Sequence, residues 1–309
     1  MAFGKQTYNS ANELRESLLD IIKDISPNES NYFVSNLGKG TPALQKLHEW
    51  NLYHEARVTS EAKAIEGAET TYGDLAQEER SSNYTVTIDA SVKLSRSRAS
   101  IANVTGEDAL SVEKERALRR LKNQMEYNLI NGGVAAGSSG VASGMAGIER
   151  VISTIVTARA SGTSFTEGEL NDMVQDSWDQ VSDNYVMDLL VAPAVIKRRI
   201  ATFGTNLTRN VNAMDKKLTR EVRVYDAEIG QTVMVLAHKD IRTTAGSLLV
   251  LGLREELFET AFLVGTGEPH WEDRAQTGDW KGGTYITEFT LVSANQKASV
   301  KRTGYSNSL

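Results

Sequence analysis

A single stretch, residues 106–131, decides how the chain is organised: GEDALSVEKERALRRLKNQMEYNLIN. Thr105, followed by Asp108 three positions on, provides a cap at its start, and Gly132-Gly133 ends it. Apolar residues recur at helical spacing between these ends: Leu110, Ala117, Leu118, Leu121, Met125 and Leu129. At about 1.5 Å per residue this helix is roughly 39 Å long, so it spans a small domain from end to end.

The polar face of this predicted helix is strongly basic. Its cations are Lys114, Arg116, Arg119, Arg120 and Lys122. Residues 93–122 together carry eight bases and four acids, a local charge of +4 in a chain whose net charge is −6. A charged helix face is most simply a solvated one, and a surface for an acidic partner is the alternative.

The segment before the helix predicts two strands joined by an acidic tip. Residues 84–95 alternate apolar and polar side chains over their whole length, and residues 50–58 alternate less cleanly. Between them, residues 59–83 hold Ile65 and Leu75 as their only large aliphatic residues and carry six acids against two bases, a charge of −4. A connection of this length that cannot bury itself is uncommon inside a compact domain. We therefore predict a long hairpin that protrudes and needs a partner surface.

The remaining elements predict an α+β fold, with helices and strands in separate clusters rather than alternating βαβ units. An amphipathic helix is expected over residues 10–26, and a flexible connector over residues 38–42. Another helix should open near Thr166, and a further one should run from Pro193 to Phe203. The residues expected inside the Thr166 helix are Leu170, Met173, Val174, Trp178 and Val181. Strands are expected at Val186–Ala192, Glu221–Tyr225, Thr232–Ala237, Ser247–Leu251, Leu257–Val264 and Tyr285–Ala294, with a hairpin turn at Ile229-Gly230 and a loop over 132–147.

The composition is that of a folded protein with few routes to covalent or metal chemistry. The 309 residues include no cysteine, which excludes thiolate catalysis, zinc–thiolate sites, iron–sulfur clusters and disulfides. Acidic residues outnumber basic ones, 40 against 34, which argues against a protein whose main task is to coat nucleic acid. No window approaches the roughly 20 apolar residues of a membrane-spanning helix. The N-terminus also lacks the apolar core of a signal peptide, so we expect synthesis without secretion and no membrane partner.

No catalytic, cofactor or metal site is predicted. The chain has four histidines, and no pair has helical ligand spacing: His48, His54, His238 and His270. One catalytic pattern needs weighing, because Ser60-Glu61-Ala62-Lys63 followed by Ser182-Asp183-Asn184 has the order found in penicillin-recognising serine enzymes. The third element should be Lys-Thr-Gly, whereas this chain has Gln276-Thr277-Gly278. A serine hydrolase using Ser60 and Lys63 is therefore the alternative from another class, weakened further because Ser60 falls in the polar tip rather than at a buried helix start.

The opposite charges of the tip and the basic segment predict a contact between copies of the chain. We expect the tip of one subunit to lie across the 93–122 region of its neighbour, in a head-to-tail contact that can be repeated. The carboxylates expected in this contact are Glu66, Glu69, Glu78 and Glu79, and the expected arginines are Arg96, Arg98, Arg116, Arg119 and Arg120.

Short motifs in a fixed order carry a family resemblance from about residue 30 to 304. They are Gly40-Thr41-Pro42 to His48-Glu49-Trp50, Ile65-Glu66-Gly67, Met145-Ala146-Gly147-Ile148, Ala275-Gln276-Thr277-Gly278-Asp279-Trp280, Glu288-Phe289-Thr290-Leu291 and Asn295-Gln296-Lys297-Ala298. In this order, and around one long helix, they resemble the major capsid protein of tailed bacteriophages with the Hong Kong 97 fold. Gln276 departs from the pattern, which more often has Lys there.

The resemblance implies a division of the chain into four parts. Residues 1–50 would be an N-terminal arm and residues 51–97 an extended β-hairpin loop. Residues 98–158 and 272–309 would form a peripheral domain with a spine helix at 106–131. Residues 159–271 would form an axial domain whose tips meet around five-fold and six-fold axes.

The resemblance also implies a structural function without cofactors. Subunits would self-assemble in the host cytoplasm, as hexamers and pentamers, into an icosahedral head of the virion that encloses double-stranded DNA. It allows scaffolding, portal and decoration proteins as further partners, and only weak, non-specific contact with the packaged DNA. A bacterial nanocompartment shell is the alternative within the same fold.

Overall fold

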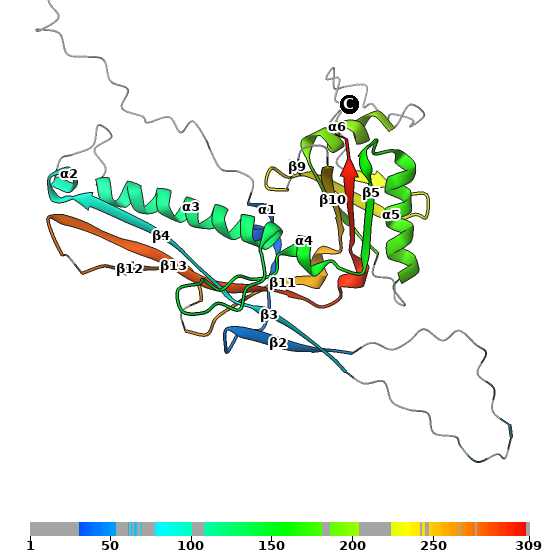
Figure 1. The fold of residues 1–309 in the computed structure, drawn as a ribbon, viewed down its shortest axis with the longest axis horizontal. Coiled ribbons are helices and arrows are strands. Elements are labelled where there is room, and N and C mark those ends of the chain that lie inside the picture. The colour runs from blue at the N-terminus through cyan, green and yellow to red at the C-terminus, as the bar shows by residue number, and fades with distance from the viewer. Residues whose placement is uncertain are drawn as a thin grey trace, which may run out of the picture.

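The structure, a computed structural model, describes residues 31–306 apart from 54–60, 62, 64, 67–68, 70–77, 101–107, 181–185, 204–223, 242, 245–246, 266 and 276. The predicted helix over residues 10–26 lies outside the described residues. In Figure 1 the described chain forms a long arm, built from one sheet and one helix, beside a more compact body built around a second sheet. The shorter elements are α1 (Tyr32–Asn36), β2 (Leu47–Leu52), β3 (Glu79–Tyr84), α2 (Arg96–Ser100), α4 (Ile148–Val151), η2 (Glu255–Leu257) and η3 (Gln296–Ala298).

The arm is built on a long sheet with the strand order β1–β11–β13–β12, in which β4 also pairs with β13. Its strands are β1 (Gly38–Lys39), β4 (Val86–Ser95), β11 (Phe258–Phe262), β12 (His270–Asp273) and β13 (Trp280–Ser293). The β4–β13 ladder is antiparallel and runs from Trp280↔Ser95 to Phe289↔Val86. Successive side chains of β4 point to opposite faces of the sheet. On one face Val86, Ala90 and Val92 are buried, and on the other Thr87 and Ser91 are exposed.

Helix α3 (Ala109–Asn131) lies along the buried face of this sheet. Ala117 and Leu121 are fully buried and pack with Ala90 and Val92 of β4. The C-terminal half of α3 continues into a second cluster, where Leu129 packs among residues of both sheets. One helix thus supplies a continuous apolar stripe along the arm and into the body.

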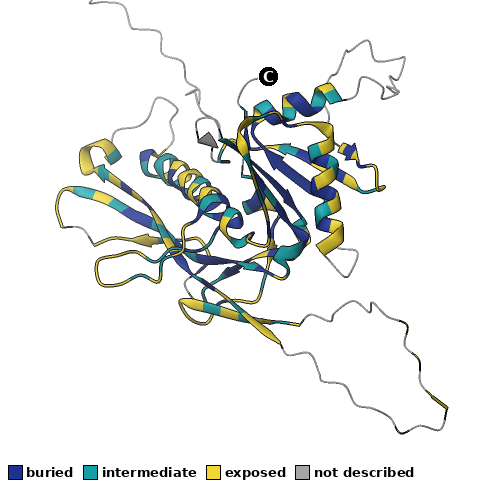
Figure 2. Ribbon diagram, turned by 45° about the vertical axis from the view of Figure 1, so that its right-hand side comes forward, coloured by how far each residue is buried: buried dark blue, intermediate teal, exposed yellow. Residues whose placement is uncertain are grey.

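The body is built on a compact sheet with the order β5–β14–β10–β6–β8–β7, with β9 also paired to β10. Its strands are β5 (Ile155–Thr163), β6 (Leu189–Ala192), β7 (Val224–Asp226), β8 (Thr232–Ala237), β9 (Thr243–Thr244), β10 (Ser247–Leu253) and β14 (Val300–Tyr305). Strand β6 is buried on both faces: Leu189 and Val191 join the cluster shared with α3, and Leu190 and Ala192 join the one packed by α5 (Glu167–Gln180) and α6 (Ala194–Phe203). Figure 2 shows these central strands as the buried core of the body.

A buried carboxylate joins the arm, the body and the start of the described chain. Glu126 of α3 accepts hydrogen bonds from the backbone N–H groups of Phe33 (2.9 Å) and Val34 (2.8 Å), at the start of α1. His238, after β8, lies with Nε2 2.9 Å from Glu126 Oε1, and the two side chains are 1 % and 0 % exposed. The backbone N–H of Asp240 donates to His238 Nδ1 at 3.1 Å, so in the neutral ring Nε2 carries the hydrogen and donates it to Glu126.

A second polar cluster holds the end of β14 to α5. Arg302 is 2 % exposed; its guanidinium donates to Glu169 and, at 2.6 Å, to Asp176. Tyr305 donates to the same Glu169 carboxylate at 2.8 Å, and Arg159 of β5 pairs with it at 2.9 Å. Burial acts to raise the pKa of Glu169, but these hydrogen bonds and the charge of Arg302 outweigh it and lower the pKa. Burial, with the hydrogen bond to Glu169, raises the pKa of Tyr305 to about 12.

Several predicted elements are confirmed. Helix α3 ends at Gly132 as expected, and β8 spans the predicted Thr232–Ala237. The turn between β7 and β8 contains Gly230 with φ of 82°, a left-handed conformation that glycine adopts without strain. Helix α6 follows Pro193 and ends at Phe203.

Other local predictions are wrong. The connector over residues 38–42 is not free, because Gly38 and Lys39 form β1 and pair in parallel with Glu259 and Thr260. The cap of α3 is Asp108, whose carboxylate accepts from the N–H of Ser111 at 3.2 Å, while Thr105 lies outside the described residues. Trp178 of α5 is half exposed rather than inside.

The pairing of the hairpin also differs from the prediction. Strand β2 pairs with β3, from Leu47↔Tyr84 to Leu52↔Glu79, and not with β4 at residues 86–95. The strongly alternating segment becomes β4 and pairs with β13 instead, because its apolar face is needed to cover α3. The sheets also differ in extent from the expected division at residues 159–271 and 272–309. Strand β11 lies in the first range but belongs to the long sheet, and β14 lies in the second but belongs to the compact sheet.

The Glu126 cluster makes a direct prediction about stability. Replacing Glu126 with Ala removes the acceptor of two backbone N–H groups at the start of α1 and the carboxylate beside His238 Nε2, at about 1–3 kcal/mol for each lost bond. We expect Glu126→Ala to lower the free energy of unfolding of the unassembled subunit by more than about 3 kcal/mol. Glu115→Ala on the exposed face of α3 is the matched control, and equal urea-unfolding midpoints for the two variants would contradict the prediction.

The Glu169 cluster makes a prediction about pH. Because the folded-state pKa of Glu169 lies below its ordinary value of 4.5, its ionised form stabilises the fold fully above that value, and this stabilisation is lost as pH falls through the folded-state pKa. We expect the unfolding midpoint to fall less steeply in Glu169→Gln than in the wild type between about pH 5 and about pH 3. Identical pH profiles, with Glu115→Gln as the exposed control, would exclude this contribution.

Candidate inter-subunit interface

The root of the predicted hairpin is a two-stranded ladder of β2 and β3 that lies beside the long sheet (Figure 1). Most of its side chains are exposed or half exposed, as Figure 2 shows. An isolated two-stranded ladder is at best marginally stable in water. Its direction must therefore be fixed by contacts at the root.

Asn83 provides the main anchor of the root. Its side-chain amide donates to the carbonyl oxygens of Ala146 (3.1 Å) and Leu291 (2.8 Å), and its Oδ1 accepts from the N–H groups of Tyr84 (2.9 Å) and Ala146 (2.8 Å). The side chain is buried and all its polar atoms are used. It ties the hairpin to β13 and to the loop after α3.

Three further bonds hold the same region. Trp50 Nε1 donates to the carbonyl oxygen of Ser293 at 3.1 Å. The hydroxyl of Thr290 donates to the Tyr84 carbonyl oxygen at 2.9 Å, and that of Thr85 donates to Glu288 at 2.7 Å. The root is thus a rigid base for the hairpin.

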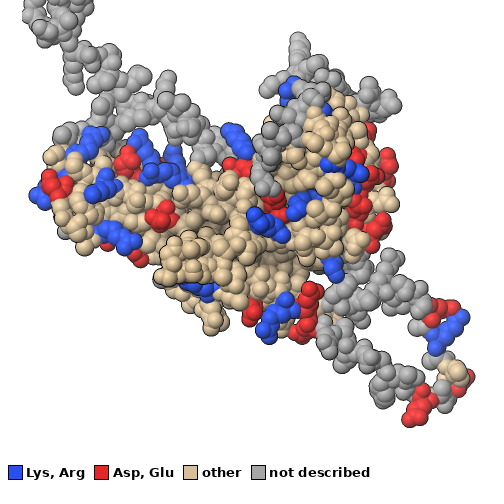
Figure 3. Space-filling model, viewed as in Figure 1, with Lys and Arg blue, Asp and Glu red and all other residues tan. Residues whose placement is uncertain are grey.

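The described residues of the tip are exposed, and most carry charge. Ile65 is 82 % exposed, and Glu61, Glu66, Glu69 and Glu78 are also exposed. Glu61 forms an ion pair with Lys63 at 2.6 Å, and Glu78 accepts a hydrogen bond from Asn51 at 2.9 Å. Figure 3 shows the tip well separated from the body, with acidic and basic groups side by side.

The predicted arginines lie together on α2 and α3, and several have acidic partners within the chain. Arg96 pairs with Asp279 (3.0 Å), Arg116 with Glu113 (2.6 Å) and Arg119 with Glu115 (2.8 Å). Arg120 reaches the carbonyl oxygen of Ser91 at 3.5 Å, and Arg98 completes the group on α2. These pairs are solvent-exposed, so each contributes little to stability and leaves the arginine accessible. Among the described residues, no ion pair joins the predicted tip carboxylates to these arginines within one chain.

Aromatic contacts, which were not predicted from the sequence, hold two further cations of this region. Lys114 Nζ lies 4.4 Å from the ring centre of Trp271, and Lys93 Nζ lies 4.9 Å from that of Trp280. Both are cation–π contacts between α3 or β4 and the neighbouring strands. The Lys114 contact stiffens the basic face of α3 without neutralising it, whereas Lys93 lies on the side of β4 that faces away from α3.

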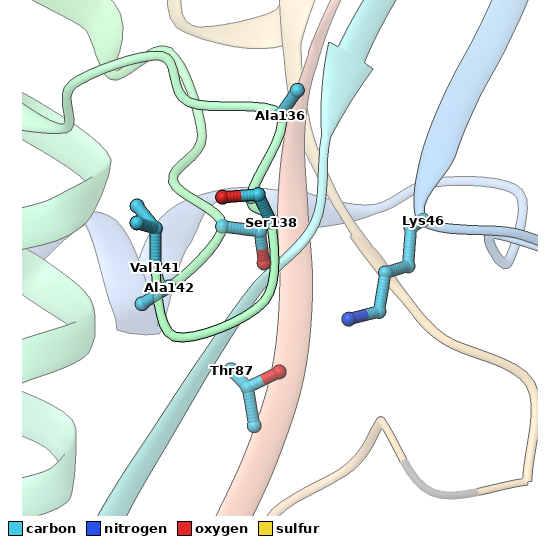
Figure 4. A pocket seen from close by; sticks show the side chains of 8 residues that line it. Lys46, Thr87, Ala136, Ser138, Val141 and Ala142 are labelled. Carbon is cyan, nitrogen blue, oxygen red and sulfur yellow. The ribbon is translucent and has the colours of Figure 1, made fainter.

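A pocket of about 360 Å³ lies next to the hairpin root (Figure 4). Its lining residues are Lys46, Thr87, Ala136, Gly137, Ser138, Val141, Ala142 and Ser143. Figure 4 shows Lys46 extending from the segment before β2 toward the loop that carries Ser138 and Val141, with Thr87 of β4 at one side. No local pattern in the sequence predicts this pocket, because it forms between three separate segments.

The described residues offer no metal-binding or catalytic group of side chains. No cluster of three His, Asp or Glu residues suited to a metal lies among them. Of the pattern weighed for a serine hydrolase, Ser60 and residues 182–184 lie outside the described part, and Lys63 is paired with Glu61. No helix in the described ranges is long and apolar enough to cross a membrane.

Solved structures with the same architecture align with nearly the whole chain. The capsid of the native GTA particle has a TM-score of 0.69 at 10 % identity, covering 98 % of this chain and 100 % of that one. The capsid of Myoviridae phage XM1 has a TM-score of 0.62 at 11 % identity and covers 94 % and 96 %. The SrpI encapsulin from Synechococcus elongatus PCC 7942 has a TM-score of 0.59 at 12 % identity and covers 98 % and 97 %. At these identities the likeness establishes the fold alone, a mixed α+β fold of the Hong Kong 97 type.

The sequence itself separates a phage head from an encapsulin shell. The family described as SU10 major capsid protein matches residues 3–306. The chain belongs to this family. No curated protein sequence matches it.

Membership of the SU10 major capsid protein family confirms the predicted function. The chain is a major capsid protein of a tailed phage, a subunit of the icosahedral head and hence of the virion. The family is structural and non-enzymatic, which removes the serine hydrolase alternative. Capsid assemblies with this fold also imply that the protein associates with copies of itself.

The Asn83 anchor can be tested in this capsid protein by an isosteric change. Asn83→Asp replaces the donating amide with an oxygen that faces two carbonyl oxygens, so it converts two hydrogen bonds into repulsion. We expect a loss of roughly 2–4 kcal/mol in the free energy of unfolding and faster proteolysis at the hairpin. Asn51→Ser, which loses only an exposed hydrogen bond to Glu78, is the control, and equal stability and proteolysis of the two variants would refute the anchoring role.

Proposed function

We propose that the subunits of this capsid protein associate head to tail, with the hairpin of each lying on the next, into the hexamers and pentamers of the head. The observation that carries this proposal is the hairpin itself, whose ladder starts from a rigid root and leaves most of its side chains exposed or half exposed (Figures 1 and 2). A ladder of two strands needs a covering surface, and a neighbouring subunit supplies one. Because the contact joins different surfaces of two copies, it can repeat around a closed ring.

The parts of the chain take separate roles on this proposal. Residues 1–50 act as an N-terminal arm, apart from β1, and residues 51–97 as the extended loop, apart from β4, since β1 and β4 belong to the long sheet. Helix α3 and the long sheet together act as the peripheral domain. The body around the compact sheet acts as the axial domain, with its tips at the five-fold and six-fold axes. The sheet order supports one refinement of the expected axial limits, residues 159–271. Strand β11 lies within these limits but pairs in the long sheet, so it goes with the peripheral domain. Strand β14 lies outside them but pairs in the compact sheet, so it goes with the axial domain.

Opposite charge supports the proposed contact between the hairpin tip and the arginine surface of the neighbouring subunit. The acidic side is Glu66, Glu69, Glu78 and Glu79, and the basic side on the neighbour is Arg96, Arg98, Arg116, Arg119 and Arg120. All four carboxylates are exposed, and the arginines are held in a fixed group on α2 and α3. Complementary charge of this kind speeds encounter and selects the relative orientation of the partners.

Other partners follow from the proposed role as a head subunit. Scaffolding, portal and decoration proteins are proposed as further contacts. Packaged DNA is proposed to meet the shell only weakly and without sequence preference, because the net charge of −6 opposes tight binding to a polyanion.

Charge reversal of the tip tests the proposal. We expect the variant with Glu66, Glu69, Glu78 and Glu79 changed to Lys to fold as a monomer but to form no shells in negative-stain micrographs. A matched control reverses four exposed acids of the body: Asp172, Asp179, Asp226 and Glu228. Wild-type assembly by the tip variant would overturn the proposed contact, and circular dichroism of both variants checks their folding.

A further inference from the structure

The pocket beside the hairpin root is formed by a loop that is ordered by its own hydrogen bonds. Ala135 and Gly144 exchange backbone hydrogen bonds, both of 2.9 Å, and Ser138 and Val141 exchange bonds of 3.0 and 3.1 Å. Gly140, in the turn, has φ of 84°, which glycine adopts without strain. Asn83 also fixes the end of the loop at Ala146. The pocket is therefore preformed, which lowers the entropy cost of filling it.

The lining of the pocket combines small and hydroxyl side chains with one aliphatic residue, Val141, and one positive charge, Lys46. Residues 132–148 contain no charged side chain, and Val141 at the pocket is 59 % exposed. Lys46 is the one charged group of the lining, and within the described residues its Nζ has no acidic partner. The Val141 side chain, which shares the pocket with two alanines and a cation, suits an aliphatic side chain that is next to a carboxylate.

The hairpin tip presents that combination. Ile65 is the most exposed large apolar residue of the described chain, at 82 %, and Glu66 follows it directly. Glu61 and Glu69 add further negative charge on either side. An isoleucine so exposed at the end of a projecting loop is unfavourable unless another surface covers it.

We propose that the pocket of each subunit seats Ile65 of a second copy of this chain, with Glu66 of that copy against Lys46. The volume of about 360 Å³ lies at the small end of the roughly 300–1,000 Å³ range of ligand pockets, and it suits one or two side chains. Charge complementarity between Lys46 and the acidic tip selects this occupant over a neutral apolar segment.

This inference rests on the proposed function and changes one part of it. Glu66 moves from the arginine surface to Lys46, while Glu69, Glu78 and Glu79 keep their proposed partners. The two receiving surfaces are distinct, because Thr87 at the pocket points to the side of β4 opposite to Val86, whose side packs toward α3. Variants can therefore address each surface separately.

A charge swap tests the seat. We expect Lys46→Glu and Glu66→Lys each to raise the subunit concentration needed for shell assembly about tenfold, and the double variant to return it to within about threefold of the wild type. Ile65→Ser should raise it similarly, and Val141→Ser should add little on top of Ile65→Ser, because both remove the same contact. Sedimentation measures assembled and free subunits, and urea unfolding of the free subunit checks folding, which should not change since all these positions are exposed.

The outcomes separate this seat from the proposed hairpin contact. If Glu66→Lys is rescued by Arg119→Glu rather than by Lys46→Glu, or if the single variants assemble normally while the four-residue reversal does not, the pocket is not the seat and the hairpin contact stands. If the swap fails to restore assembly, the pairing of Glu66 with Lys46 is likewise refuted. If the four-residue reversal also assembles normally, both proposals fail.

Discussion

The buried carboxylate of Glu126 is the constraint on which the arrangement of this capsid protein depends. A charge with no exposed surface is tolerated only while its hydrogen-bond donors stay in place, since losing them costs several kcal/mol. Two of those donors belong to α1, and the third is His238 at the end of β8. The spine helix, the compact sheet and the start of the described chain are therefore positioned together. The Tyr32 hydroxyl, which donates to Glu255 at 2.9 Å, adds a second tie at the same place.

Residue spacing and backbone preference in the sequence correctly predicted those features that depend on nearby residues alone. The stripe of α3, the two faces of β4, the turn at Gly230 and the start of α6 after Pro193 all follow from spacing or backbone preference, and the structure has them. The internal partners of Arg116 and Arg119 could also have been read from the sequence, because Glu113 and Glu115 precede them by three and four residues.

Pairings between distant segments were beyond such patterns. The partner of β4 lies nearly two hundred residues away, and a two-residue parallel strand such as β1 has no local signature. Asn83 and Glu126 are polar residues in buried positions, and only the groups around them show what they hold. The charges of the candidate interface were visible in the sequence, whereas the Lys46 pocket was not, because three segments must meet to form it.

The two candidate receiving surfaces would contribute differently to assembly. Exposed arginines already paired with nearby acids gain little from one more carboxylate, so they act mainly on the rate and orientation of encounter. A preformed pocket that covers an exposed isoleucine acts on how long the contact lasts, because apolar burial adds free energy that salt does not screen. The rigid root fixed by Asn83 and Trp50 matters for both, since it limits the directions in which the tip can search.

The place of β14 has a consequence for how the subunit is made. Strand β14 lies between β5 and β10 in the compact sheet, yet it comes from residues 300–305. During synthesis, β5 has no neighbouring strand in that sheet until residues 300–305 have left the ribosome. Until then the Glu169 carboxylate also lacks its hydrogen bonds from Arg302 and Tyr305. A chain interrupted earlier lacks an inner strand of the body, so it cannot close its core. The fold thereby acts as a check on completeness, and only finished subunits present the rigid surfaces from which a regular shell is built.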